Sequence, residues 1–160
     1  MIEGINMDRL KLVREQVDGV LSALPEEEKR TGYIHLYGVS QACAFLAIKR
    51  GEDAELAAVA GVLHDLYVYK TGSRADHAHK GAAFARGVLD AVGVFTEKEK
   101  IKITDAIYRH SDKAQVNSKF DEILKDADVL QHCLYDPAAE RTGVKEERFK
   151  TVMNPKRAKA

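Results

Sequence analysis

The chain has 160 residues, of which 45% are hydrophobic, and this length and composition suit one globular domain rather than a disordered chain. Its 25 basic residues balance its 25 acidic residues, which argues against the broad basic surface of a nucleic-acid-binding protein. No apolar run is long enough for a membrane-spanning helix, and no secretory signal pattern is present, so we expect a cytoplasmic protein.

Hydrophobic residues recur at helical spacing along almost the whole chain, whereas the alternating Val, Ile and Thr runs that predict strands are missing. Pro25 ends the first helical pattern, and Gly51, Gly72 and Gly93 mark later breaks. In chain order, the spacing predicts helices over 7–24, 35–50, 53–67, 77–92, 97–111, 119–135 and 144–152.

These patterns predict an all-α fold, a single compact bundle of about six to seven helices over residues 1–152, followed by a polar tail over 153–160. Asp53 and Thr96 are expected N-caps, and Glu99, three residues after Thr96, completes a capping box. Residues 32–34 and 68–76 are expected to be loops that border a functional site.

The adjacent pair His64-Asp65 follows a strongly apolar helical segment, residues 54–63. Neighbouring residues on a helix point about 100° apart, so both side chains can reach one ion placed between their directions. A solvent-exposed helix end would show the same pair, so the pair gains meaning only from the rest of the chain.

Four further segments have His or Asp on or beside apolar helices, in a fixed order around the doublet. Together with the doublet, the matching segments are His35-Leu36-Tyr37-Gly38-Val39, Ala60-Gly61-Val62-Leu63-His64-Asp65, His77 with Gly81-Ala82, Ala106 to His110, and Asp126-Ala127-Asp128 with Leu130. This ordered set, over about residues 31–135, resembles the HD superfamily of metal-dependent phosphohydrolases.

The resemblance implies one divalent metal ion held by four residues, His35, His64, Asp65 and Asp128. Asp126 is the alternative to Asp128, which we prefer because it follows a small residue, as the family's ligand does. The ligands are nitrogen and oxygen without thiolate, a set that suits Mn, Fe, Co, Ni, Zn or Mg without selecting among them.

His77 and His110 occupy the positions at which the family binds a second metal ion or the substrate phosphate. His79 is the alternative to His77, which we prefer because only His77 has a glycine, Gly81, four residues later. With two ions, Asp65 is expected to bridge them, as in two-metal phosphatases.

Basic side chains near these ligands are candidates for contacts with phosphate oxygens, although charged residues are more often simply exposed. They are Lys70, Arg74, Lys80 and Arg109. Asp65 or Asp76 is expected to relay a proton. Four tyrosines are candidates for stacking on a substrate ring, namely Tyr37, Tyr67, Tyr69 and Tyr108.

We therefore expect a hydrolase that uses metal-activated water on a phosphate ester of a nucleotide or related small metabolite. The alternative is a metal-containing ligand-binding or sensory module with little hydrolytic activity, and oxidative chemistry at a di-iron centre is a more distant third. The turn 66–69 lacks the acid that some nucleotidases of this fold have there. The amphipathic stripe of residues 7–24 caps the protein's own bundle or forms a homodimer.

Overall fold

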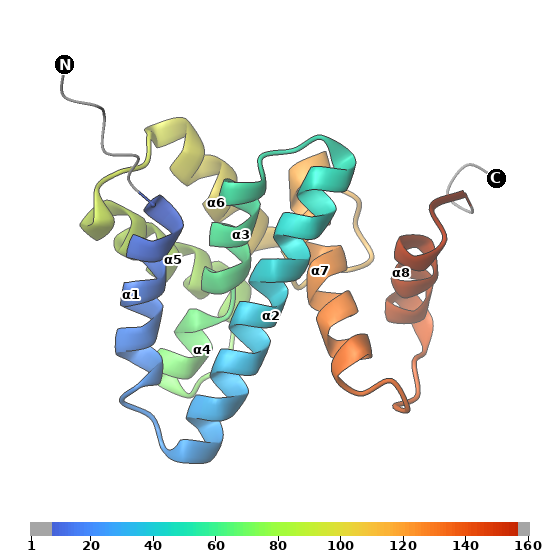
Figure 1. The fold of residues 1–160 in the computed structure, drawn as a ribbon, viewed down its shortest axis with the longest axis horizontal. Coiled ribbons are helices and arrows are strands. Elements are labelled where there is room, and N and C mark those ends of the chain that lie inside the picture. The colour runs from blue at the N-terminus through green and yellow to red at the C-terminus, as the bar shows by residue number, and fades with distance from the viewer. Residues whose placement is uncertain (1–7, 157–160) are drawn as a thin grey trace.

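A computed structural model describes residues 8–156, in which all the regular structure is helical (Figure 1). Its helices are α1 (Arg9–Leu21), α2 (Glu26–Arg50), α3 (Ala54–Leu63), α4 (Leu66–Thr71), α5 (His77–Val92), α6 (Glu97–Arg109), α7 (Lys119–Tyr135) and α8 (Gly143–Met153). The predicted all-α fold is confirmed, although the helix predicted over 53–67 is divided between α3 and α4. None of these helices has both the length and the apolar character required to cross a membrane.

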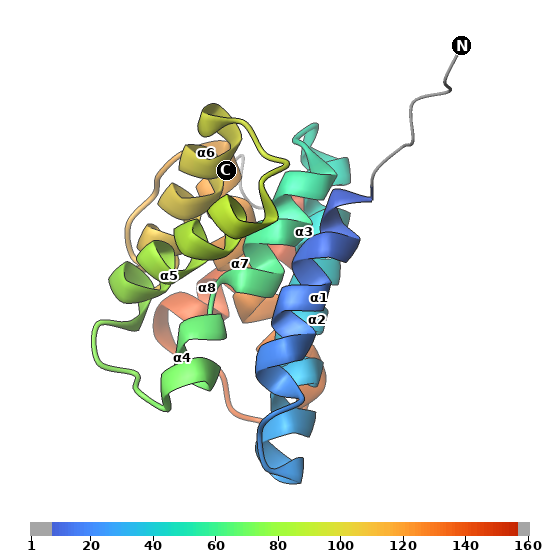
Figure 2. The same cartoon turned by 90° about the vertical axis from the view of Figure 1, so that its left-hand side faces the viewer.

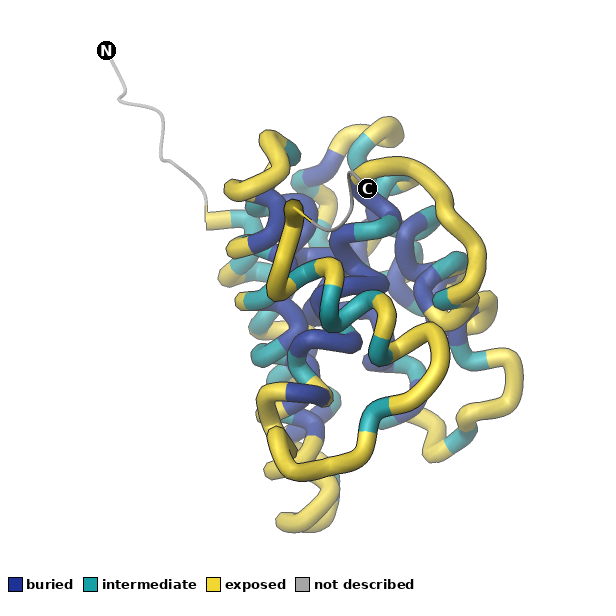
Figure 3. Tube along the Cα trace, turned by 90° about the vertical axis from the view of Figure 1, so that its right-hand side faces the viewer, coloured by how far each residue is buried: buried dark blue, intermediate teal, exposed yellow. Residues whose placement is uncertain are grey.

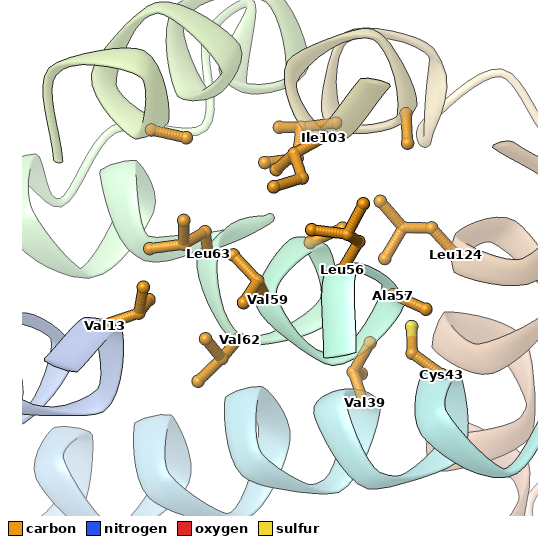
Figure 4. Close-up of a cluster of buried hydrophobic side chains, with 14 of the residues drawn as sticks. Val13, Val39, Cys43, Leu56, Ala57, Val59, Val62, Leu63, Ile103 and Leu124 are labelled. Atoms are coloured by element: carbon orange, nitrogen blue, oxygen red, sulfur yellow. The ribbon is translucent and has the colours of Figure 1, made fainter. Parts of the chain in front are cut away.

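The core is built around α3, in which every residue from Leu56 to Leu63 is buried. The helix lies between α1 and α2 on one side and α5 and α6 on the other (Figure 2), and it contacts α1, α2, α6 and α7. Figure 4 shows side chains of these four neighbours directed at α3. A helix that is apolar all round leaves no face for solvent, so its burial follows directly from its sequence.

The close crossing of α2 and α3 depends on Gly61. A Cβ atom at this position would lie 2.8 Å from the Cα atom of Ser40 and 2.9 Å from its backbone nitrogen. The Ser40 hydroxyl also donates a hydrogen bond across the crossing, to the carbonyl oxygen of Ala58 (2.8 Å). The missing side chain thus allows α2 to lie directly against the end of α3 that precedes the His-Asp doublet.

The predicted loop over residues 32–34 is wrong, because these residues lie inside α2. The helix begins at Glu26, after Pro25, and three glutamates occupy its first turn, where acidic side chains interact favourably with the helix dipole. Gly32 serves packing rather than a turn, since a Cβ there would lie 2.6 Å from the Leu21 side chain of α1.

The chain breaks its helix at the doublet itself. α3 ends at Leu63, and α4 begins at Leu66, with Asp65 between them at φ −114° and ψ 10°. The loop predicted over 68–76 is therefore wrong for residues 68–71, which belong to α4 and end at Gly72 with φ +71°. The predicted N-caps and the capping box at Thr96 are confirmed.

The last helix, α8, lies at the edge of the molecule against α7 (Figure 1). None of its residues is buried, in contrast to the dark core behind it in Figure 3. Its bounds agree with the helix predicted over 144–152. Of the predicted tail, residues 157–160 lie outside the described residues, as do residues 1–7 of the predicted domain.

The Gly61 crossing yields a stability prediction. Gly61→Ala is expected to lower the free energy of unfolding by about 1–3 kcal/mol, because the added methyl group meets backbone rather than a movable side chain. Gly87→Ala in α5 is the matched control, since a Cβ there meets nothing within 4 Å. This control should be neutral or raise stability by up to about 1 kcal/mol. Urea denaturation of the metal-free protein measures the free energy of unfolding of both variants. Equal changes in the two variants would show that Gly61 is not required for the crossing.

Candidate metal centre

Segments far apart in the sequence bring six predicted residues to one place. The residues are His35 from the middle of α2, His64 and Asp65 from the junction of α3 and α4, His77 at the start of α5, His110 at the end of α6, and Asp128 from α7. Potential ligand atoms of these six residues and of His132 fall into four overlapping groups of three, two of which share Asp65. The first of these two joins His35 and His64 to Asp65, with Asp128 beside both imidazoles, and the second joins His77 and His110 to Asp65.

The first group has the spacing that one metal ion requires. The Nε2 atoms of His35 and His64 lie 3.2 Å apart. Each lies 3.5–3.6 Å from Asp65 Oδ2 and 3.6 Å from Asp128 Oδ1. Metal–ligand bonds of about 2.1 Å place neighbouring ligand atoms roughly 3.0–3.5 Å apart in octahedral or tetrahedral geometry. The distances from the two imidazoles to each other and to each carboxylate therefore match those between neighbouring ligands of a single ion.

The second group is built on the other oxygen of Asp65. Its Oδ1 atom lies 3.3 Å from His110 Nε2 and 3.7 Å from His77 Nε2. Because Oδ2 faces the first group, one carboxylate serves both groups. This is the arrangement in which a carboxylate bridges two ions.

The four histidine rings are each held by a hydrogen bond at Nδ1. Their Nδ1 atoms lie against carbonyl oxygens, namely Gln131 Oε1 for His35 (2.8 Å), Gly61 O for His64 (2.7 Å), Arg74 O for His77 (3.2 Å) and Ile107 O for His110 (2.6 Å). A carbonyl oxygen can only accept, so each Nδ1 donates its proton, and the Nε2 atom of each neutral ring is left to bind an ion at the centre. Such outer hydrogen bonds fix the tautomer that a metal ligand needs.

Two buried carboxylate oxygens of the centre have no hydrogen-bond partner among the described residues. The Oδ1 atoms of Asp65 and Asp128 are buried and accept no hydrogen bond from any residue in 8–156. The facing Nε2 lone pairs of His35 and His64 would repel each other unless a proton or a cation lay between them. A buried carboxylate oxygen without a partner is costly, and a divalent cation would satisfy both features. The donor set therefore fits the expected metal ions.

The neighbouring histidines keep both carboxylates ionised. Burial would raise the pKa of Asp65, but His64 and His110 beside it hold that pKa far below its usual value. Burial acts likewise on Asp128, where His132 and His64 hold the pKa well below its usual range. For His64, burial would lower the pKa, but the two carboxylates outweigh burial and raise it.

Ion pairs distinguish Asp126 from Asp128, the two candidates for the ligand from α7. Asp126 points away from the centre and binds Arg50 Nη2 (2.8 Å) and Arg148 Nη1 (2.8 Å). Asp128, two residues later on α7, lies in the centre. The geometry therefore favours Asp128, as the sequence did.

His79 and Asp76 form a separate pair on the surface. His79 Nδ1 lies 2.7 Å from Asp76 Oδ1, and its ring stacks on Tyr108 with ring centroids 3.9 Å apart. The geometry therefore favours His77 over His79 as a ligand. Asp76 is exposed and lies outside the pocket lining, so the structure gives no support for its predicted role as a proton relay.

A pocket of about 450 Å³ opens onto the centre. Of the four basic residues predicted to bind phosphate, only Arg74 lines it. Lys70 and Lys80 are exposed elsewhere, and Arg109 is held by an ion pair with Asp121 (2.9 Å). The positions of these three residues do not support the prediction, because helical periodicity does not show which polar side chain finds a partner.

The pocket residues that the sequence analysis missed include three with basic side chains, namely Lys113, His132 and Lys145. Lys113, in the α6–α7 connection (residues 110–118), donates to Asp128 Oδ2 (2.7 Å). His132 Nε2 lies 3.5 Å from Asp128 Oδ1, and its spacing of four residues from Asp128 was a usable signal. Lys145 reaches the pocket from α8, and nothing in the sequence pattern indicated this.

Of the four tyrosines considered for stacking, only Tyr69 lines the pocket. Tyr37 donates a hydrogen bond to Asp18, and Tyr67 packs against Phe84. Tyr108 is the residue on which His79 stacks. Stacking roles for these three are therefore not supported by their positions.

Comparisons with known proteins agree with this arrangement. The model of the HD domain family matches residues 32–132, which include every residue of the two ligand groups. A solved structure of a predicted HD superfamily hydrolase from an uncultured Thermotogales bacterium has the same fold. It is 23% identical with a TM-score of 0.56, covering 94% of this chain and 88% of that chain. No curated protein sequence matches significantly. From the family match over most of its length, the chain belongs to the HD domain family.

Proposed function

We propose that the protein is a metal-dependent phosphohydrolase that acts on a phosphate ester of a nucleotide or a related small metabolite. The observation that carries this proposal is the pair of ligand groups sharing Asp65 at the base of a pocket of about 450 Å³. Membership of the HD domain family supports hydrolysis as the reaction class.

The residues divide into two sets of ligands. His35, His64, Asp65 and Asp128 would hold the first ion, and the second would bind to His77, His110 and the remaining oxygen of Asp65. Divalent ions supply charge that neutralises phosphoryl oxygens and lower the pKa of bound water. The imidazole and carboxylate donors admit Mn, Fe, Co, Ni, Zn or Mg.

The remaining pocket residues suit a phosphorylated small molecule. The cavity volume lies within the roughly 300–1,000 Å³ range of small-molecule sites. Arg74 and Lys113 line it and provide donors for phosphate oxygens. Tyr69 and Tyr135 also line it and offer aromatic surface for a base or sugar. These features favour a nucleotide-like ester over a simple inorganic substrate.

Replacement of the shared carboxylate tests the proposal. Asp65→Asn is expected to abolish binding of both ions and to reduce hydrolysis by about a hundredfold or more, because it removes several kcal/mol of charge stabilisation. Elemental analysis gives metal content, and a panel of phosphate esters with Mn²⁺, Co²⁺, Ni²⁺ and Mg²⁺ gives turnover.

Asp76→Asn is the matched control, since Asp76 is exposed outside the pocket, and it should keep both metal and activity. Hydrolysis that survives Asp65→Asn would sink the proposal. Tight ligand binding without turnover across the panel would point to the sensory module instead. A visible absorption band after aerobic loading with iron would point to oxidative chemistry.

The two groups are expected to respond differently to single substitutions. His77→Ala should remove the second ion only and lower turnover, because none of the four ligands of the first group is changed. His79→Ala is its control and should change neither, since His79 lies in the surface pair with Asp76. Stoichiometry is measured by calorimetric titration with Mn²⁺. Loss of both ions in His77→Ala would contradict the division into two groups.

Metal affinity should fall as the pH is lowered. In the metal-free protein the neighbouring carboxylates raise the pKa of His64, so an ion must displace a proton from this residue, and the protonated fraction increases as the pH falls. We expect the Mn²⁺ dissociation constant to increase steadily from about pH 8 to pH 6, across the histidine titration range. A dissociation constant that is constant over this range would contradict histidine ligation.

A further inference from the structure

The α6–α7 connection is tied to the body of the protein by Arg148 of α8. Its Nε donates to the carbonyl oxygen of Lys113 (2.8 Å), and its Nη2 donates to that of Gln115 (3.2 Å). Its Nη1 donates to Glu122 Oε2 (2.7 Å) and Asp126 Oδ1 (2.8 Å), both in α7. One guanidinium group thus joins α8, α7 and the connection.

A second cation holds the same connection from α7. Lys125 is fully buried, and its ammonium group donates to the carbonyl oxygen of Gln115 (2.7 Å) and to Asn117 Oδ1 (2.6 Å). Glu122 pairs with it at 3.2 Å. A buried lysine is tolerated only when it is paired and hydrogen-bonded, so these contacts fix the connection in one conformation.

The connection carries Lys113 to the metal centre. The ammonium group of Lys113 contacts Asp128 Oδ2 (2.7 Å) and the carbonyl oxygen of His110, and it lines the pocket. Asp128 belongs to the first ligand group, so Lys113 lies beside the place where a substrate phosphate would meet the ions. Its backbone carbonyl is the one that Arg148 holds.

We propose that Lys113 binds the phosphate group of the substrate and that Arg148 is the positioning residue that keeps Lys113 there. The proposal rests on the proposed function, because it assigns a residue to the phosphate that the hydrolase would take. An ammonium group is a compact charge that binds phosphate oxygens strongly. On this account α8, which lies outside the family match over 32–132, is part of the active site.

The way α8 is attached supports a positioning role. None of its residues is buried, although Val152 packs against the hydrophobic core, so apolar contacts hold α8 only at its edge (Figure 3). Arg148 instead uses two of its hydrogen bonds on backbone carbonyls of the connection. Hydrogen bonds to backbone carbonyl oxygens fix the position of a loop, and they bury little apolar surface.

The test is binding of inorganic phosphate to the Mn²⁺-loaded protein, measured by calorimetry after the Mn²⁺ affinity of each variant is known. Lys113→Met should weaken phosphate binding about tenfold, because one charge-assisted hydrogen bond is lost. Arg148→Met should weaken it severalfold in the wild-type background. In the Lys113→Met background Arg148→Met should have little further effect, since two residues that act together are not additive.

Two variants separate positioning from general stability. Arg141→Met is the matched control, because the hydrogen bond of Arg141 goes to Glu146 of α8 (3.0 Å) and not to a carbonyl oxygen of the connection, so phosphate binding should be unchanged. Arg148→Lys keeps charge beside Glu122 and Asp126 but lacks the planar fork, so it should give an intermediate loss. If Arg148→Met does not fold, Arg148→Lys takes its place in the double-mutant comparison with Lys113→Met.

Unchanged phosphate binding in Lys113→Met with Mn²⁺ bound would overturn the inference. So would an equal effect of Arg148→Met in both backgrounds, or wild-type protein that binds Mn²⁺ but no phosphate. Failure of the proposed function looks different. If the phosphate results are as expected but the wild-type protein hydrolyses no ester in the panel, the binding site stands and the hydrolase activity does not.

Discussion

The buried carboxylate of Asp65 is the constraint on which the site depends. Its two oxygens face two different groups of imidazole nitrogens, and Oδ1 accepts no hydrogen bond from the described part of the chain. Such a carboxylate is stable in the interior only beside positive charge. In the metal-free protein the neighbouring imidazoles, His64 foremost, stand in for that charge. Divalent ions would replace them and leave the imidazoles neutral, as ligands must be.

The fold can be understood as the support for this carboxylate. The helix break at the doublet turns His64 and Asp65 toward the centre, and the buried α3 fixes where that break lies. The α2–α3 crossing at Gly61 brings His35 against His64, and the carbonyl oxygen of Gly61 also orients the His64 ring. A single glycine therefore serves both the packing of two helices and the geometry of a ligand. Sites that must hold charge in the interior need this kind of rigid support.

Much of the site could be predicted from the sequence because its ligands are locally marked. The doublet ends an apolar helix, and His35 and Asp128 lie on helices with strong periodicity, so their direction followed from the pattern. The structure also separates Asp128 from Asp126 by giving the latter two arginine partners. That choice depends on Arg50 and Arg148, which come from other helices and which no local pattern could indicate.

The parts that could not be predicted depend on contacts between distant segments. Whether Arg109 faced a substrate or a carboxylate was decided by Asp121 on another helix. Lys113 reaches the pocket only because the α6–α7 connection is held by Arg148 and Lys125. The break between α3 and α4 opposes the helical preference of its sequence, since tertiary packing can override local propensity. Functional sites are where such conflicts are expected.

Anomalous diffraction from crystals soaked in Mn²⁺ tests the central claim most directly. The account predicts two anomalous peaks about 3.5–4 Å apart, with one oxygen of Asp65 bound to each ion. A single peak, from an ion bound by His35, His64 and the two aspartates, would support the first metal site and contradict the second. No peak at Asp65, or peaks only at surface groups such as Asp76 and His79, would contradict the account.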